Sequence, residues 1–540
     1  GLQPGDMWKV KEVNKSALAK FIRATGLKDS LARLLFLRDV KTQESAQKFL
    51  NPQLSDLHSP SLLPDIEKAL ERIIYALKNR ESILIWGHED LDGITSTVIL
   101  YETLRDLRAS DIQYYIPEKH VEKHGLNSAK VKAVNQIKLV ITVDCGITNF
   151  SDVQELKDSG IDTVIIEHHE VLDKLPDALA NIDPKRKDSK YPFRGLAAAG
   201  VTLKIVMALS EKLLKIKPDE FFSIKPDLLA LTALGTISDR VPLLEENRIL
   251  VKYGLEQIKK TSIPAIRVLL EQENLDSFDL TADKLLGHLL PLFASANGNQ
   301  GCQYFLNDNY EANRAWVQEL STQRMRWKEE ANQALAIAEK YLDLSAGLLI
   351  VRSGDLPLKT LGHCASKLKE RFQVPAIIIG KRDETWLGEC RGMDGVNLVD
   401  LLKANEQYFI DYGGHKKASG FSILEENIEP FIQGAKDYAR KNFAGKIKAE
   451  EIIADLILPL SELSKEYTEL GPFGEGNPSP LLIAPNTTLQ RVENRLFSPD
   501  NPNLTLKNNF SLSGSPDGSF DLLYTFDENL TVYIKQTLPK

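Results

Sequence analysis

Three potential metal-ligating side chains recur at alternate positions near residue 90. Residues 82–96, SILIWGHEDLDGITS, place His88, Asp90 and Asp92 after a run of β-forming residues that ends at Gly87. If the chain stays extended beyond this glycine, alternation brings the three side chains to one side of the backbone. Clustered carboxylates repel one another unless a cation lies among them. The simpler alternative is a polar turn in which Asp92 caps a following helix, and this stretch alone does not distinguish the two interpretations.

Acidic and imidazole side chains also follow later apolar runs. KLVITVD at 138–144 and DTVIIEHH at 162–169 have the pattern of buried strands, and LLALTALGTIS that of a buried helix. The potential ligands at the ends of these runs are Asp144, Glu167, His168, His169 and Asp239. Because the carboxyl ends of parallel strands share one edge of a sheet, we expect these side chains to converge with Asp90 and Asp92. Four independent groups of this kind favour one shared metal site over coincidence.

The expected ligand set combines carboxylates with imidazole and contains no thiolate. Such a set suits Mn²⁺ or Mg²⁺ better than a structural zinc ion. A carboxylate such as Asp92 or Asp144 could bridge two ions. Two ions a few ångströms apart can activate water and clamp a phosphate during in-line displacement.

The elements that must position these residues follow from the hydrophobic pattern. An amphipathic helix at 65–79 leads into the first strand, a second strand is expected at 112–119, and helical segments separate the strands. This alternation predicts an α/β fold with a parallel, doubly wound sheet. Residues 297–301, NGNQG, are a strong loop signal, and residues 310–342 have the pattern of one long helix.

Two further segments follow the long helix. Strand-like runs AGLLIVR and PAIIIG flank a helical pattern, which predicts a second, smaller α/β unit. Short β-like runs punctuated by Asn, Gly and Pro then predict a small β-barrel. The divisions we expect are a helical lead-in at 1–60, the main α/β domain at 61–308, a connecting helix at 309–345, the second α/β domain at 346–445 and the barrel at 446–540.

The composition is that of a folded chain with several domains. Of its 540 residues, 43% are apolar and 26% are charged. A net charge of −8 argues against a broad basic surface that coats DNA, although it leaves room for a narrow basic groove. Four scattered cysteines indicate a reducing cytoplasm, and we find neither a signal peptide nor an apolar run long enough to cross a bilayer.

Taken in order, these stretches resemble the RecJ-type single-strand-specific exonucleases of the DHH phosphoesterase superfamily. Residues 82–96 resemble the first motif of the family, VDCGIT at 143–148 the second, and EHH at 167–169 the motif that names it. Further similar segments are NIDPKRKDSKYPFRGLAAAG at 181–200, ALGTISDRVPL at 233–243, GVNLVDLL at 395–402, YGGHKKASGF at 412–421 and LGPFGEGNPSP at 470–480. The resemblance covers nearly the whole chain.

This resemblance implies a DHH-type sheet domain, a long linker helix, a DHH-associated domain and a C-terminal OB-like barrel. The ligands it implies for two Mn²⁺ or Mg²⁺ ions are Asp90, Asp92, Asp144, His168 and Asp239, with His88 as a further candidate. His169 would lie near the scissile phosphate, and Asp92 and Asp144 would act with it in catalysis. The residues implied for DNA contact are Arg391, Gly413, Gly414, His415 and Lys119.

The implied reaction is stepwise hydrolysis of single-stranded DNA from the 5′ end to 5′-mononucleotides, in DNA repair and recombination. Single-stranded DNA is therefore the expected partner, with no membrane association. A single-strand-binding protein or a helicase is a candidate protein partner, and we expect a monomer.

The chain departs from the family pattern at four places. His88 stands where the first motif usually has an aspartate, although relatives elsewhere in the superfamily begin this motif with a metal-binding histidine. Glu167 replaces the first aspartate of the triplet and reaches one methylene further. Residues 291–298, PLFASANG, lack the arginines of the family motif, and GECRG at 388–392 keeps Arg391 without the usual flanking serines. The loss of bidentate phosphate donors weakens recognition of a DNA end.

Two other functions compete with the nuclease. One is a non-enzymatic DNA-binding scaffold, because a RecJ-like subunit of the eukaryotic replicative helicase has lost nuclease activity. The departures at Leu292, Ala294 and Gly298 favour this alternative, whereas retention of all five expected ligands favours the enzyme. The other is a phosphodiesterase that acts on short oligonucleotides or cyclic dinucleotides. The long chain and the OB-like C-terminus argue against it.

Overall fold

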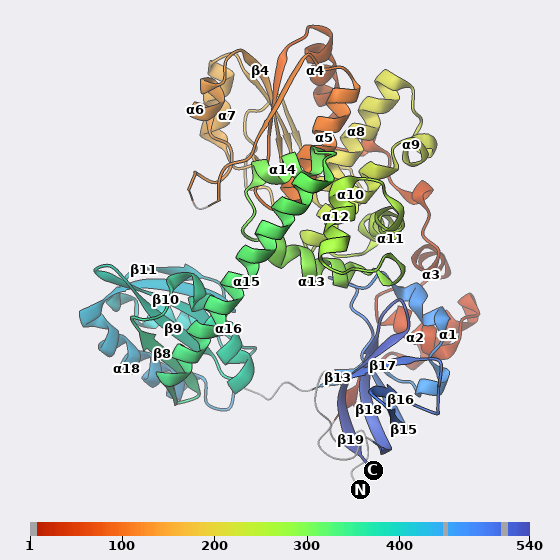
Figure 1. Cartoon of the computed structure of the whole chain (residues 1–540), viewed down its shortest axis with the longest axis vertical. Coiled ribbons are helices and arrows are strands. Elements are labelled where there is room, and N and C mark those ends of the chain that lie inside the picture. The colour runs from red at the N-terminus through yellow and green to blue at the C-terminus, as the bar shows by residue number, and fades with distance from the viewer. Residues whose placement is uncertain (1–7, 120, 447–451, 509–516) are drawn as a thin grey trace. The chain divides into compact units, whose positions relative to one another are not determined.

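The computed structural model divides the chain into two compact units, residues 1–321 with 453–540, and residues 322–452. In Figure 1, the first unit carries the red to green part of the chain, up to the start of α15 (Tyr310–Lys340), and its blue end. The structure describes residues 8–119, 121–446, 452–508 and 517–540.

A five-stranded parallel sheet forms the middle of the first unit, with the strand order β3-β2-β4-β5-β6. The strands are β2 (Ser82–Trp86), β3 (Asp111–Tyr115), β4 (Ile137–Val143), β5 (Asp162–Ile166) and β6 (Ala180–Ile182). The expected parallel sheet is thus confirmed. The chain moves from β2 to one neighbour, β3, and then crosses to the other, β4. This reversal places a crevice beyond the carboxyl ends of β2 and β4, where open α/β sheets bind ligands.

Helices cover both faces of the sheet because neighbouring residues of a strand point to opposite sides. Ile83 and Ile85 of β2 share a core with α4 (Ile66–Lys78), α5 (Leu91–Asp106), α8 (Ala198–Leu214) and α10 (Pro226–Ser238). Leu84 and Trp86 face α6 (Ser128–Ala133) and α7 (Phe150–Asp158). Figure 1 shows α6 and α7 on one side of β4, and α4, α5 and α8 on the other. Further helices are α9 (Pro218–Ile224), α11 (Glu245–Lys260), α12 (Pro264–Gln272), α13 (Ala282–Phe293) and α14 (Gly298–Leu306).

The C-terminal strands close into a barrel in the order β15-β16-β17-β19-β18, with β18 pairing back to β15 and β14 extending β15. Their bounds are β14 (Leu456–Ile457), β15 (Leu482–Val492), β16 (Arg495–Phe497), β17 (Thr505–Asn508), β18 (Gly518–Phe526) and β19 (Thr531–Pro539). The parallel pairing of β17 with β19 closes the ring, and the remaining pairs in it are antiparallel. The expected OB-like barrel is confirmed.

The N-terminal helices pack against this barrel. Leu34 and Leu35 share one hydrophobic core with Tyr467 and Leu482. The segments involved are α1 (Lys15–Thr25), α2 (Asp29–Phe36) and α3 (Gln43–Leu50), and β1 (Lys9–Val10) pairs in parallel with β13 (Ile453–Ala454). Figure 1 shows the red α1 and α2 beside the blue strands. The two ends of the chain therefore contribute to the same folded core.

The second unit contains a mixed six-stranded sheet with the order β11-β12-β10-β9-β8-β7, in which only β8 and β9 pair in parallel. Its strands are β7 (Leu342–Ser345), β8 (Leu348–Ser353), β9 (Ala376–Arg382), β10 (Thr385–Arg391), β11 (Phe409–Gly414) and β12 (Ala418–Leu424). Its helices include α16 (Leu361–Phe372), α17 (Leu398–Ala404) and α18 (Glu425–Asn442). The predicted long helix, α15 (Tyr310–Lys340), leads the chain from the first unit into this second α/β unit.

The loop expected at 297–301 is instead the start of α14. Asn297 is the helix cap, and its side chain accepts a hydrogen bond from Gln300 N at 3.1 Å. A Cβ at Gly298 would lie 2.3 Å from Ile116 Cγ2, so this glycine permits close packing rather than a turn. Across the described part of the chain, we find no helix whose length and apolar character would let it cross a membrane.

Candidate metal centre

The first potential ligands lie where β2 gives way to α5. The expected extended path is wrong here, because α5 begins at Leu91 and Asp90 is the last extended residue. Asp90, rather than Asp92, caps the helix, since its Oδ1 accepts a hydrogen bond from Gly93 N at 2.8 Å. Asp92 lies in the first helical turn. A tight turn, rather than strand alternation, therefore brings the side chains of this motif together. The turn is so close that a Cβ at Gly93 would lie 2.4 Å from His88 O.

The carboxylate of Asp92 is fully buried at the N-terminus of α8. Its Oδ2 accepts a hydrogen bond from Ala198 N at 3.0 Å, and its Oδ1 accepts one from Ala199 N at 2.8 Å. Burial, followed by repulsion from Asp239 and Asp90, still raises the pKa of Asp92 well above its usual value. A cation beside Asp92 would offset both effects.

Asp144 follows β4 in a left-handed backbone conformation, with φ 61°. Its Oδ1 lies 3.0 Å from His168 Nε2, and its Oδ2 lies 3.4 Å from His88 Nδ1. The same His88 nitrogen is 3.3 Å from Asp90 Oδ2. Neither Asp144 Oδ2 nor His88 Nδ1 has a hydrogen-bond partner, although both atoms are buried. Asp144 therefore faces two groups of potential ligands, one with each carboxylate oxygen.

The second group gathers around the imidazole of His168. Its Nε2 lies 3.7 Å from Asp92 Oδ2 and 3.7 Å from Asp239 Oδ2. Burial lowers the pKa of His168 to about 4, so the ring is neutral near pH 7 and can offer a nitrogen lone pair. Burial and the charge of Asp90 raise the pKa of Asp239 to about 6. The structure thus brings together every metal ligand that the sequence predicts.

The donors fit a pair of divalent ions. Each group supplies one imidazole nitrogen and carboxylate oxygens, and Asp144 faces both groups. Burial and the surrounding carboxylates raise the pKa of Asp144 well above its usual value, and its Oδ2 is left unpaired among them. A positive charge at this place would relieve the repulsion and give the unpaired atom a partner. An oxygen-rich donor set of this kind suits Mn²⁺ or Mg²⁺.

His169 lies beside the two groups, and about half of its side chain is exposed. Its Nδ1 is 2.5 Å from Oε1 of Glu167, a buried carboxylate that also accepts a hydrogen bond from His168 N at 3.0 Å. The hydrogen bond to Glu167 raises the pKa of His169 above its usual value. This pairing orients the ring and leaves Nε2 available to a substrate.

The remaining predicted site residues are Lys119 in the first unit and Arg391, Gly413, Gly414 and His415 in the second. Lys119 is exposed in the loop after β3. Arg391 ends β10 in the second unit, where its Nη1 donates to Glu389 Oε2 at 2.9 Å. The glycines at 413–414 end β11, and the backbone N–H of His415 donates to Ala418 O at 2.8 Å in the turn to β12. The glycine pair is therefore part of a β-hairpin.

Asp183 is a buried acid that the sequence analysis missed. It follows β6, and Oδ1 accepts a hydrogen bond from Lys185 N at 2.8 Å, whereas Oδ2 has no partner. Burial raises the pKa of Asp183 to about 7. The signal that identified Asp144, an acid after an apolar strand, also applies here. A strand of three residues is too short for that pattern to be recognised.

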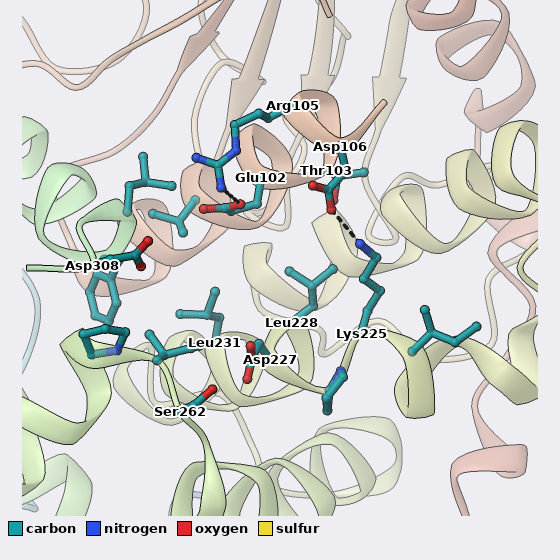
Figure 2. A pocket seen from close by; sticks show the side chains of 17 residues that line it. Glu102, Thr103, Arg105, Asp106, Lys225, Asp227, Leu228, Leu231, Ser262 and Asp308 are labelled. Carbon is teal, nitrogen blue, oxygen red and sulfur yellow. Dashed lines mark hydrogen bonds and ion pairs between the residues drawn. The ribbon is translucent and has the colours of Figure 1, made fainter. Parts of the chain in front are cut away.

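A separate cavity of about 420 Å³ lies at the opposite end of α5. Figure 2 shows Arg105 reaching towards Glu102, and Lys225 reaching towards Asp106. Lys225 Nζ is 2.6 Å from Asp106 Oδ2. None of the predicted site residues lines this cavity, and these charged groups pair with one another. The cavity is therefore distinct from the metal centre.

Known proteins resemble this chain over most of its length. A model described as DHH family, N-terminal domain, matches residues 82–236, and the DHHA1 domain model matches residues 345–441. The single-stranded-DNA-specific exonuclease RecJ of Salmonella typhimurium is 32% identical over 78% of this chain and 77% of its own length. RecJ of Bacillus subtilis is 28% identical over 93% of this chain and 64% of its own length, so the chain spans less than two thirds of that relative.

A solved structure also matches nearly the whole fold. The crystal structure of RecJ in complex with Mn²⁺ from Thermus thermophilus has a TM-score of 0.73 and is 23% identical, covering 99% of this chain and 80% of that chain. At this identity the likeness shows that the folds are the same, and the roles of individual residues must be argued from the site itself.

Proposed function

Since the chain belongs to the RecJ family of single-stranded-DNA-specific exonucleases, we propose that it hydrolyses single-stranded DNA from the 5′ end and releases 5′-mononucleotides. The observation that carries this proposal is the position of Asp144, with one carboxylate oxygen facing His168 and the other facing His88. A carboxylate between two ligand groups suits a pair of ions close enough to act together in phosphodiester hydrolysis.

The residues that would hold two Mn²⁺ or Mg²⁺ ions are Asp90, Asp92, Asp144, His168 and Asp239, with His88 through Nδ1. When bound, the ions would activate a water molecule and stabilise the negative charge that develops during in-line displacement at phosphorus. The two backbone N–H groups of α8 hold Asp92 in one orientation, and the hydrogen bond from Gly93 N does the same for Asp90. These contacts set the ligand geometry before substrate arrives.

His169 is suited to act on the scissile phosphate. Glu167 accepts the hydrogen on Nδ1, so Nε2 is the nitrogen that is left to face a substrate. The hydrogen bond to Glu167 raises the pKa of His169, and in a protonated ring Nε2–H can donate to a phosphate oxygen. The same hydrogen can pass to the 3′ oxygen that leaves when the terminal nucleotide is released.

Lys119, Arg391, Gly413, Gly414 and His415 are proposed to hold the DNA backbone, where cations and backbone N–H groups contact phosphates without reading sequence. The chain would act in the cytoplasm as a monomer, in DNA repair and recombination, together with a single-strand-binding protein or a helicase. We retain the five domain divisions expected from the sequence as part of this proposal.

Incubation of a 5′-labelled single strand with Mn²⁺ tests the activity. The parent should release labelled mononucleotide at once, whereas a 3′-labelled strand should yield labelled mononucleotide only at the end of digestion. Asp239→Asn should abolish cleavage, because it removes one charge from a proposed metal ligand. This ligand is not fully buried, so the substitution should leave the fold intact. Asp106→Asn, at the far end of α5, is the matched control and should cleave like the parent.

The outcome separates the competing functions. Tight binding of the strand without cleavage by the parent would contradict the nuclease and support a scaffold, which the missing arginines at 291–298 favour. Cleavage confined to very short oligonucleotides would support a phosphodiesterase instead. Early release of label from the 3′ end would contradict the proposed direction.

A further inference from the structure

Glu89 lies between two histidines at the edge of the proposed metal centre. Its Oε2 is 3.3 Å from His88 Nε2, and its Oε1 is 4.0 Å from His124 Nδ1. Only 16% of its side chain is exposed. Among the residues that the structure describes, this carboxylate has no lysine or arginine partner, and imidazoles are the groups that face it. A carboxylate that is largely shielded from water, with such neighbours, is stabilised when it accepts a hydrogen from one of them.

The two nitrogens of His88 have different surroundings. Nδ1 faces Asp90 Oδ2 at 3.3 Å and Asp144 Oδ2 at 3.4 Å, whereas Nε2 faces Glu89. A neutral imidazole carries one hydrogen, and only the other nitrogen can bind a cation. If Nδ1 carried the hydrogen, His88 could not be a ligand of the centre. The position of one hydrogen therefore decides what His88 does.

We propose that Glu89 is a positioning residue that accepts the Nε2 hydrogen of His88 and leaves the Nδ1 lone pair directed at the metal centre. This inference rests on the proposed two-metal site. A carboxylate that holds the far nitrogen of a metal-binding histidine fixes its tautomer and ring orientation, and raises its basicity. An aspartate at position 88, as the family usually has, needs no such partner because a carboxylate has no tautomer to fix.

His124 supports the same arrangement from the outer side. Its ring packs edge-on against the ring of His88, with centroids 5.0 Å apart and an interplanar angle of 86°. The contact limits the space into which the His88 ring can move, because a second ring packs against it. His124 itself is largely exposed, so it limits movement without being part of the centre.

Calorimetric titration of the full chain with Mn²⁺ tests the inference through a cycle of four proteins. They are the parent, Glu89→Gln, His88→Asp and the double variant. We expect Glu89→Gln to weaken Mn²⁺ binding about tenfold or more in the parent. In the His88→Asp background the same change should alter the affinity by less than about twofold, since the histidine on which it acts is gone.

Two further variants complete the test, one that moves the carboxylate of residue 89 without removing its charge and one that serves as a control. Glu89→Asp keeps the charge but withdraws the oxygen by one methylene, so it should weaken Mn²⁺ binding as Glu89→Gln does. Glu273→Gln is the matched control, because Glu273 Oε2 lies 2.7 Å from His288 Nδ1 in a carboxylate–imidazole pair outside the centre. It should leave the Mn²⁺ affinity unchanged. Circular dichroism verifies that each variant is folded.

Three results would overturn the inference in distinguishable ways. An unchanged affinity in folded Glu89→Gln removes the role of Glu89 and leaves the metal centre intact. An equal loss in both backgrounds means that Glu89 acts on the centre by charge alone, without His88. Failure of the parent itself to bind Mn²⁺ overturns the proposed centre, and the role of Glu89 with it.

Discussion

His88 gives the first ligand group an imidazole nitrogen where an all-carboxylate site would have oxygen. Mg²⁺ is bound best by oxygen ligands, whereas nitrogen donors suit the transition metals. We therefore expect His88→Asp to reduce the preference for Mn²⁺ over Mg²⁺ about tenfold in the ratio of dissociation constants, or about 1.4 kcal/mol. Titration with each ion measures the ratio, with Asp106→Asn as the control. An unchanged ratio would remove His88 from the ligand set.

Glu528, in the turn between β18 and β19, provides a pH-dependent test away from the metal centre. It accepts a hydrogen bond from Phe473 N at 2.6 Å, and burial raises its pKa from 4.5 to about 7. Since the pKa is higher in the folded state, the contribution to stability is complete below the unfolded value and is lost as pH rises through about 7. We therefore expect the free energy of unfolding of Glu528→Gln, relative to that of the parent, to rise by about 1–3 kcal/mol as the pH increases from about 5 to about 8.

Scanning calorimetry of both proteins at the two pH values measures this difference. Gln keeps an oxygen that can accept the hydrogen bond from Phe473 N but does not ionise, so only the titration is removed. A difference between the two proteins that does not change with pH would contradict the assigned pKa.

Among the helices, α10 must approach α5 and α8 closely to bring Asp239 to the centre. A Cβ at Gly235, about one turn before Asp239, would lie 2.4 Å from Thr95 Oγ1, 2.7 Å from Ala199 Cβ and 3.1 Å from Asp92 Oδ1. We expect Gly235→Ala to force these helices apart, lowering stability by about 1–3 kcal/mol. It should also weaken Mn²⁺ binding, because Asp92 and Asp239 move relative to each other. Thermal unfolding and titration measure the two effects.

Gly287→Ala is the control for this prediction, since Gly287 also lies inside a helix, α13. Nothing lies within 4 Å of a Cβ added there. Alanine has a higher helix propensity than glycine, so this variant should be neutral or up to about 1 kcal/mol more stable. Equal destabilisation at both positions would contradict the explanation from close packing.

Across the first unit, Arg248 of α11 connects the parallel-sheet domain to both ends of the chain. Its buried guanidinium lies over the ring of Phe49 at 3.9 Å and donates hydrogen bonds to Phe49 O, Glu469 O and Leu470 O. The single ammonium group of a lysine cannot donate hydrogen bonds to all three of these carbonyl oxygens, as the planar guanidinium does. We expect Arg248→Lys to destabilise the unit by about 2–4 kcal/mol, because buried polar groups lose their partners.

Thermal unfolding together with limited proteolysis tests this connection. Cleavage should accelerate in the N-terminal helices and before the barrel if Arg248 joins them to the sheet domain. Arg267→Lys, on the neighbouring helix α12, is the control and should behave like the parent. Unchanged stability of Arg248→Lys would mean that the shared hydrophobic core alone holds these parts together.

Local periodicity in the sequence was sufficient to predict the main elements of the fold. The parallel strands, the long helix, the second α/β unit and the barrel each follow from patterns that repeat within one segment. The convergence of Asp144 and His168 could also be predicted, because the carboxyl ends of parallel strands share one edge. The order of motifs then identified the family, since a series of ordered matches is more specific than any one of them.

The tertiary structure decided how individual donors are used. Whether Asp90 or Asp92 caps α5 depends on where the backbone turns, and the acceptor role of Asp92 depends on α8, which is distant in sequence. Asp144 faces both ligand groups because His168, after β5, and His88, before α5, lie 3.0 Å and 3.4 Å from its two oxygens. The core shared by the N-terminal helices and the barrel likewise cannot be predicted from the sequence of either segment alone. Periodicity shows that a face is apolar, but only packing of the whole chain determines which distant segment covers it.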